Sequence, residues 1–247
     1  MKKTYFFILI FFIVASCSKD NRWDCLKRTG EITIRSENLP AFSKLSLEDQ
    51  FQVEIIPDTV DKIIFEAGKN MLPHVTCNVT DGSLCLKNNI RCRWARDYDK
   101  QKIKIKLHAK KLTGITVKEK CEIIVEKAIC SDIFLLEVMQ NVVATTNINL
   151  QVSSFQFIQH SGTGTYEFYG TADSAYYFIK GTGYIYASKF QSDFVHVVNK
   201  STGNVYCNAR NKLYIEFTGK GDVYYSGAPS EIIFDPSSST GHVIPNF

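Results

Sequence analysis

The sequence lacks the local signatures of the common catalytic and metal-binding classes. It contains no C-x-x-C, no H-E-x-x-H and no H-x-H, so zinc ribbons, thioredoxin-like sites and zinc proteases are not indicated. The histidines are scattered, and the carboxylates form no evident pair, although the two carboxylates of a glycosidase can lie far apart in sequence. We therefore expect no catalytic residues, no metal and no cofactor.

An excess of charge of one sign is also missing. The chain has 29 Lys and Arg against 25 Asp and Glu, and two of the basic residues, Lys2 and Lys3, lie at the extreme N-terminus. Nucleic-acid binding depends on a concentration of positive charge that neutralises phosphates. The near-neutral balance argues against a nucleic-acid partner.

No apolar run is long enough to span a bilayer as a helix. The longest, YFFILIFFIV at 5–14, follows two lysines and ends at Val14-Ala15-Ser16-Cys17. This end resembles the bacterial lipobox, in which a cysteine after a small residue is acylated and becomes the new N-terminus. We predict that residues 1–16 are a lipoprotein signal peptide, that Cys17 carries the lipid and that residues 17–30 form a lipid-anchored tether. The alternatives are an ordinary membrane anchor and a plain secretory signal with a chance cysteine.

The residues after Cys17 bear on the location of the protein. Ser18-Lys19-Asp20 resembles the export signal of surface lipoproteins in the Bacteroidetes. We expect the lipid to hold the protein at the outer membrane. The cell surface is favoured over the periplasmic face.

Acylation of Cys17 would leave an odd number of cysteines, so at least one thiol stays free. Cys25 and Cys92 lie in polar, turn-like contexts. We predict a disulfide between them, which would pin the tether to the folded domain; the alternative is two unpaired thiols. Among apolar neighbours, Cys121, Cys130 and Cys207 are expected to be small core residues.

A hairpin is predicted around Asp81-Gly82, a dipeptide typical of tight turns. A two-residue turn pairs Cys77 with Leu86 and Asn78 with Cys85. Cys77 and Cys85 then point to opposite faces of the sheet, which argues against a bridge between them.

Apolar and polar residues alternate with period two almost throughout, and no stretch keeps a helical period, so the chain is predicted to be all-β. Four units in the second half align on a shared glycine, which is the second glycine of a Gly-x-Gly in three of them, 18–20 residues apart. Two apolar rows follow and should point inward. The glycines are Gly164, Gly183, Gly203 and Gly221; the rows are Tyr166, Ile185, Val205, Val223 and Phe168, Ala187, Cys207, Tyr225.

A fixed period near twenty residues with two short strands per unit is typical of a stacked solenoid. Weaker copies extend upstream at 120–125 and 140–145. We predict a β-solenoid, similar to a right-handed β-helix, with coils of about twenty residues. A β-sandwich is the alternative. Residues 31–112 would form an N-terminal strand region and residues 113–247 the repeat region, continuous with it.

The Gly-x-Gly of three units, which reads Ser201-Thr202-Gly203 in the remaining unit, is followed by a strand rather than by a helix. Phosphate loops hold the anion at a helix N-terminus, so no nucleotide is expected. We expect the four glycines to form corners in which glycine supplies a positive φ.

The third position after each repeat glycine gives the best candidate binding face: Glu167, Tyr186, Tyr206 and Tyr224. If the coils stack, these side chains lie in line and face outward, where aromatic rings can hold sugar rings or partner side chains. The alternative is a cross-strand ladder that only stabilises the sheet.

Two further surface features are expected. Lys102, Lys104 and Lys106 alternate with apolar residues and read as the solvated face of a strand, with contact to an anionic polysaccharide as the alternative. Asp58-Thr59-Val60 and Asp173-Ser174-Ala175 resemble the O-glycan acceptor motif of exported Bacteroidetes proteins, which makes Thr59 and Ser174 candidates for modification.

Four runs together resemble the GIN-domain family of auto-transporter adhesin heads: FSKLSLEDQFQVEII, IIFEAGKNMLPHV, VTDGSLCLKN and GKGDVYYSGAPSEI. The match covers roughly residues 40–230. The resemblance implies a β-solenoid-like, non-enzymatic protein of a kind frequent among Bacteroidetes lipoproteins. Our interpretation is a non-catalytic binding or adhesion module with a glycan or a protein as ligand. A structural or assembly partner that binds another envelope protein through an open end or edge is the competing class. An enzyme acting on polysaccharide is third.

Overall fold

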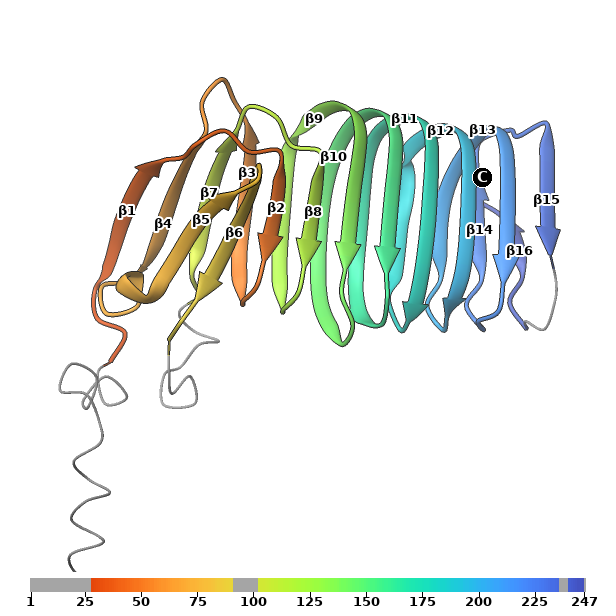
Figure 1. The fold of residues 1–247 in the computed structure, drawn as a ribbon. Helices are drawn as coiled ribbons and strands as arrows, with labels where there is room; N and C mark the ends of the chain where they lie inside the picture. The colour runs from red at the N-terminus through yellow and green to blue at the C-terminus, as the bar shows by residue number, and fades with distance from the viewer. Residues whose placement is uncertain (1–27, 91–101, 236–239, 247) are drawn as a thin grey trace, which may run out of the picture.

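The computed structural model describes residues 28–90, 102–235 and 240–246. In these described residues, sixteen strands form one continuous sheet that coils around a hydrophobic core (Figure 1). The described residues contain no helix that is long and apolar enough to cross a membrane. Within the described ranges the 3-10 turn η4 covers Leu72–His74.

Short strands begin and end the coil, and long strands form its middle (Figure 1). The N-terminal short strands are β1 (Ile32–Asn38), β2 (Lys44–Leu47), β3 (Phe51–Pro57), β4 (Lys62–Gly68), β5 (Val75–Thr80), β6 (Ser83–Asn88), β7 (Lys104–Ala109) and β8 (Gly114–Val117). The long strands are β9 (Cys121–Val138), β10 (Val142–Gln159), β11 (Gly162–Gly181), β12 (Tyr184–Ser201) and β13 (Val205–Phe217). The last strands are β14 (Val223–Ser226), β15 (Glu231–Asp235) and β16 (Val243–Pro245).

The pairing divides the sheet into two walls. We call first wall the strands β1, β4, β7 and β3, the first halves of β9 to β13, and then β14 and β16. We call second wall the strands β5, β6, β2 and β8, the second halves of β9 to β13, and then β15. Each long strand therefore contributes to both walls, and the N-terminal strands continue the same two walls.

Parallel stacking of the long strands confirms the predicted β-solenoid. Val142 pairs with Gly162, Ile185 with Val205 and Val205 with Val223, which are offsets of 20, 20 and 18 residues. The alternative of a β-sandwich is wrong for this region, because a sandwich is built from antiparallel sheets. Antiparallel pairs occur only nearer the N-terminus among the described strands, in β1–β4, β4–β7 and β5–β6.

The β5–β6 hairpin has the predicted register. Cys77 pairs with Leu86 and Asn78 with Cys85, and both thiols are free. The pKa of Cys77 is raised to about 12, first by burial and then by Glu37. That of Cys85 is raised by burial and by Glu48. The two thiols thus have different carboxylate neighbours, as expected for side chains on opposite faces of one hairpin.

The predicted inner rows form the core. Tyr166, Ile185, Val205 and Val223 are fully buried, as are Phe168, Ala187 and Cys207 in the second row, whereas Tyr225 is half-buried against the core. Phe155 packs edge-on against Phe168 and Phe190, with ring centroids 4.8 and 5.3 Å apart. Each large apolar side chain removed from water in this way contributes about 1.5–3 kcal/mol.

The corner glycines are needed for a different reason from the one predicted. The residues with positive φ are others, including Gly162 and Gly181, two positions before Gly164 and Gly183. A Cβ at Gly203 would lie 1.8 Å from the carbonyl oxygen of Gly183, and one at Gly164 would lie 2.2 Å from the carbonyl oxygen of Ala144. Successive corners therefore stack so closely that no side chain fits between them.

Polar side chains fill the inside of the last corners. Ser201 and Asn199 are buried, and Ser201 Oγ accepts a hydrogen bond from the Gly203 amide at 2.7 Å. Asn199 Nδ2 donates to the carbonyl oxygen of Gly221 at 3.0 Å. These bonds satisfy backbone groups that the tight turn removes from the strand ladder.

Of the three cysteines expected in the core, Cys121 and Cys207 are buried, and Cys130 is exposed. Ile129 occupies the inward position at this point of β9, so the next residue in the alternation points to solvent. The prediction for Cys130 was wrong. Cys17, Cys25 and Cys92 lie outside the described residues.

Candidate binding face

One row of outward-facing residues crosses the whole first wall in a single register, and we call it the long row. Neighbouring members are cross-strand partners on adjacent strands, so the row runs along the solenoid axis for about 48 Å at a strand spacing of ~4.8 Å. Its members in spatial order are Ser36, Ile64, Lys106, Glu54, Ile124, Asn147, Glu167, Tyr186, Tyr206, Tyr224 and Ile244. The four residues singled out from the sequence all belong to it and are consecutive.

Three tyrosines of the long row, Tyr186, Tyr206 and Tyr224, form a stack that we call the tyrosine row. The Tyr186 and Tyr206 rings lie 5.2 Å apart with 11° between their planes, and the Tyr206 and Tyr224 rings lie 4.7 Å apart with 12° between them. Tyr184, which the sequence did not single out, stacks on Tyr186 at 6.5 Å. Because the rings cover one another's faces, their edges and hydroxyl groups are the parts open to a ligand.

In the long row, Glu167 lies between Tyr186 of the tyrosine row and Asn147. Its carboxylate accepts hydrogen bonds from Asn147 Nδ2 at 3.2 Å and from the Tyr169 hydroxyl at 2.8 Å. The second bond raises the pKa of Tyr169, because the phenol donates to a negatively charged acceptor. Glu167 is therefore held in place by the neighbouring strand β10 and by its own strand β11.

A groove of about 550 Å³ hollows the other half of the long row, over β1, β4, β7, β3 and β9, and we call it the charged groove. Lys106 Nζ lies 3.1 Å from Glu54 Oε2, and Lys104 Nζ lies 3.3 Å from Glu66 Oε1. Isoleucines from three strands lie among these ion pairs: Ile34, Ile64 and Ile124. The groove thus combines apolar patches with two ion pairs, and the Glu126 carboxylate also lines it.

The three lysines in and just before strand β7 lie on a solvated face, as predicted. Lys102, Lys104 and Lys106 are exposed, and the residues between them are buried. Lys102 Nζ lies 3.5 Å from Glu122 Oε2, so each lysine has a carboxylate partner. This pairing weakens the alternative of a cationic patch for an anionic polysaccharide.

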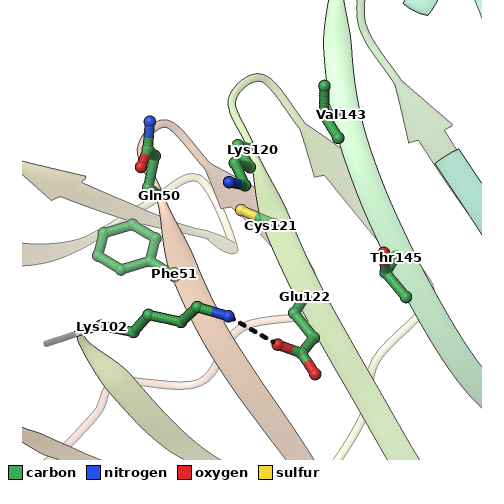
Figure 2. A pocket seen from close by; sticks show the side chains of 8 residues that line it. All are labelled: Gln50, Phe51, Lys102, Lys120, Cys121, Glu122, Val143 and Thr145. Carbon is green, nitrogen blue, oxygen red and sulfur yellow. Dashed lines mark hydrogen bonds and ion pairs between the residues drawn. The ribbon is translucent and has the colours of Figure 1, made fainter. Parts of the chain in front are cut away.

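A smaller pocket of about 110 Å³ lies beside the charged groove, at the start of β3, β9 and β10 (Figure 2). Figure 2 shows Lys102 reaching toward Glu122 and the Cys121 thiol beneath Lys120. Cys121 Sγ donates to the carbonyl oxygen of Asp49 at 3.1 Å, and burial raises the pKa of the thiol to about 12. Burial therefore disfavours the thiolate, which is the nucleophilic form of cysteine.

The two O-glycan candidates lie in different settings. Thr59 is exposed after β3, where its amide donates to Asp58 Oδ1 at 2.6 Å. That bond and one from His108 to Asp58 Oδ2 at 2.7 Å lower the pKa of Asp58. Ser174 is half-buried within β11, and its hydroxyl donates to the Ser153 carbonyl at 3.5 Å. In residues 28–90, 102–235 and 240–246, no group of His, Cys, Asp and Glu is placed to hold a metal ion.

Sequence reasoning missed the N-terminal half of the long row. The repeat spacing that aligned the tyrosines does not extend there: Cys121 pairs with Ala144, an offset of 23, and with Phe51, an offset of 70. Alternation within FQVEII and KIKIKL indicates which residues face outward. The order of the strands was the missing information.

Comparison with known proteins finds one matching family. The family described as "putative auto-transporter adhesin, head GIN domain" matches residues 41–229. No curated protein matches the chain.

Solved structures share the fold. A "putative adhesin" from Bacteroides fragilis is 21% identical with a TM-score of 0.78, and the match covers 90% of this chain and 100% of that one. A "putative adhesin" from Parabacteroides distasonis is 16% identical with a TM-score of 0.68, over 89% and 99% of the two chains. A "putative lipid binding protein" from the same species is 17% identical with a TM-score of 0.62, over 90% and 100%. At these identities the likeness shows the fold alone.

Proposed function

From the premise that this chain belongs to the family of the putative auto-transporter adhesin head GIN domain, we propose that it is a non-catalytic binding module of the cell envelope. Its ligand lies along the long row of the first wall. The observation that carries the proposal is the continuity of that row, in which consecutive strands from β1 to β16 each present one side chain in the same line. A linear ligand can contact every strand of such a row in turn.

The chemistry of the row favours an uncharged glycan chain. The phenol hydroxyls of the tyrosine row, the Asn147 amide and the Glu167 carboxylate are hydrogen-bonding groups that suit sugar hydroxyls. The lysines beside the charged groove are each paired with a glutamate, so they supply no net charge for an anionic ligand. Sugar rings do not stack on the ring faces within the tyrosine row, because neighbouring tyrosines cover those faces.

The mode of contact makes the proposal testable. Immobilised neutral and acidic polysaccharides are probed with the full chain in detergent, and neutral ones should bind. Tyr206→Phe removes a hydroxyl but keeps the stacked ring, and it should weaken binding up to about tenfold, since one hydrogen bond contributes about 0.5–1.5 kcal/mol. Tyr214→Phe on the second wall is the matched control and should leave binding unchanged.

Three outcomes would contradict the proposal. Equal binding by the Tyr206→Phe chain and the unaltered chain would place the ligand elsewhere. Binding to acidic polysaccharides alone would overturn the charge argument. Shortening of the polysaccharide during incubation would support an enzyme instead.

We also propose that Cys17 carries the lipid that holds the module at the outer membrane, facing the cell surface. The support is the lipobox-like end of the N-terminal run and the Ser18-Lys19-Asp20 sequence after it. Metabolic labelling with a palmitate analogue should mark the unaltered chain and not Cys17→Ser. Protease added to intact cells should digest the chain if it faces outward, and sparing of the chain would place it on the periplasmic face.

A further inference from the structure

The second wall ends at β15, which is the outermost strand at the C-terminal end of the solenoid (Figure 1). All five of its residues are exposed, and it pairs in parallel with β13. Among the described residues no other strand pairs with it. Its outer edge therefore has backbone groups in position to accept another strand.

Two apolar side chains at this end continue the core and are only partly covered. Ile232 and Phe234 are register partners of Leu213 and Ile215, which are fully buried. Ile232 is nevertheless 39% exposed and Phe234 54% exposed. Terminal units of a solenoid ordinarily present a polar outer surface. Here the inward rows stop at an open, apolar end.

The outward side of β15 has acidic residues at both ends. Glu231, Ile233 and Asp235 pair with Lys212, Tyr214 and Glu216 of β13. Lys212 Nζ lies 2.8 Å from Glu231, and Glu216 bonds His196 at 2.9 Å. The six positions thus hold three carboxylates and one lysine, and this excess of negative charge complements a basic partner.

A second copy of this chain does not supply basic residues at this edge. Antiparallel pairing of two β15 strands would place the glutamate of one copy beside the aspartate of the other, which is destabilising. Head-to-tail stacking would bring β15 to β5, the second-wall edge at the opposite end. The sequence of β5, VTCNVT, has no charged residue to match the acids.

We propose that β15 accepts an extended segment of another protein as the next strand of the second wall. The segment carries a basic residue, three apolar residues and a second basic residue in succession. Its first and last residues face Glu231 and Asp235, its second and fourth cover Ile232 and Phe234, and its middle residue lies beside Ile233. The pattern is symmetric, so it fits in either strand direction. Backbone hydrogen bonds provide affinity, and the alternating side chains provide specificity.

The test uses a fluorescent peptide containing Lys-Val-Tyr-Val-Lys and its charge-reversed counterpart Glu-Val-Tyr-Val-Glu, each titrated with the full chain in detergent. We expect the lysine peptide to bind at least tenfold more tightly. Glu231→Lys combined with Asp235→Lys should reverse this preference. Such a reversal cannot arise from misfolding, because a misfolded chain would lose both peptides.

Phe234→Lys places a charge in the inward row and should abolish binding, whereas Phe194→Lys, on the same wall away from the edge, should not. Equal affinity for the two peptides, or no reversal in the charge-swapped chain, would overturn the proposal. Concentration-dependent self-association that Phe234→Lys abolishes would identify a second copy as the occupant and would overturn it as well. Tyr206→Phe should leave peptide binding intact, which separates this site from the long row.

Discussion

The Tyr206 ring lies parallel to the Tyr224 ring, with 4.7 Å between their centroids and 12° between their planes. The two residues are register partners on β13 and β14. Adjacent strands are ~4.8 Å apart, so identical rings on one face of a parallel pair stack without adjustment. The stack follows from the repeat itself, and it stabilises the sheet whether or not a ligand binds to its outer edge.

The stabilising part of the tyrosine row can be measured separately. Tyr206 stacks on two neighbours, and each cross-strand aromatic pair contributes about 0.2–1 kcal/mol, so Tyr206→Ala should lower the free energy of unfolding by about 0.5–2 kcal/mol. Tyr206→Phe keeps the ring and should change it by less than about 0.5 kcal/mol. Chemical denaturation followed by circular dichroism measures both. A loss in Tyr206→Phe as large as in Tyr206→Ala would contradict the stacking account.

The sequence was sufficient to predict this stack, because the regular spacing of Gly183, Gly203 and Gly221 places the tyrosines on adjacent coils. The charged groove could not be found in this way. Its two ion pairs join β7 to β3 and β4, and the sequence separations in the pairs are 52 and 38 residues. Alternation predicts the exposed face of each strand, and strand order depends on packing over the whole core.

The corner glycines show a different limit of sequence reasoning. The repeat predicts where these glycines lie in the fold. It does not show why glycine is required there. Positive φ and close approach of another backbone both exclude a side chain, and only the structure distinguishes them. At Gly203 the excluded volume is the carbonyl of Gly183 on the preceding coil.

Gly203→Ala should therefore be strongly destabilising. The new Cβ would lie 1.8 Å from the Gly183 carbonyl oxygen, so the stacked corners must separate. We expect a loss of about 3 kcal/mol or more in the free energy of unfolding, at the upper end of overpacking effects. Thr202→Ala, at the exposed neighbouring position, should change it by less than about 0.5 kcal/mol. A mild effect at Gly203 would indicate that the corners can separate easily.

Thiol reactivity tests the corrected placement of Cys130. Cys121 and Cys207 are buried, and burial raises the pKa of each to about 12, so neither should react with iodoacetamide in the native state. Cys130 is exposed and should be alkylated. Peptide mapping by mass spectrometry after brief labelling identifies the modified positions, and Cys130→Ser should remove that signal. Rapid labelling of Cys207 without denaturant would mean that the core opens.

An ion pair that joins the ends of β2 and β8 should make stability depend on pH. Lys118 Nζ lies 2.6 Å from Glu48 Oε1. The hydrogen bond from Lys118 lowers the pKa of Glu48, and the same bond raises the pKa of Lys118. Both shifts favour the charged forms, so the pair stabilises the fold between the acidic and the alkaline titrations.

The change in pH that removes the stabilisation has opposite directions at the two ends of this range. Because the pKa of Glu48 is depressed in the folded chain, its contribution is present above the unfolded value of about 4.3 and is lost as pH falls through the folded value. The pKa of Lys118 is raised, so its contribution is present below the unfolded value of about 10.4 and is lost as pH rises through the folded value. A double-mutant cycle with Lys118→Met and Glu48→Gln should give a coupling of about 0.2–1 kcal/mol near neutral pH, since the pair is partly exposed. The coupling should vanish in strong acid and strong alkali, and a coupling independent of pH would show that the two side chains interact through packing rather than charge.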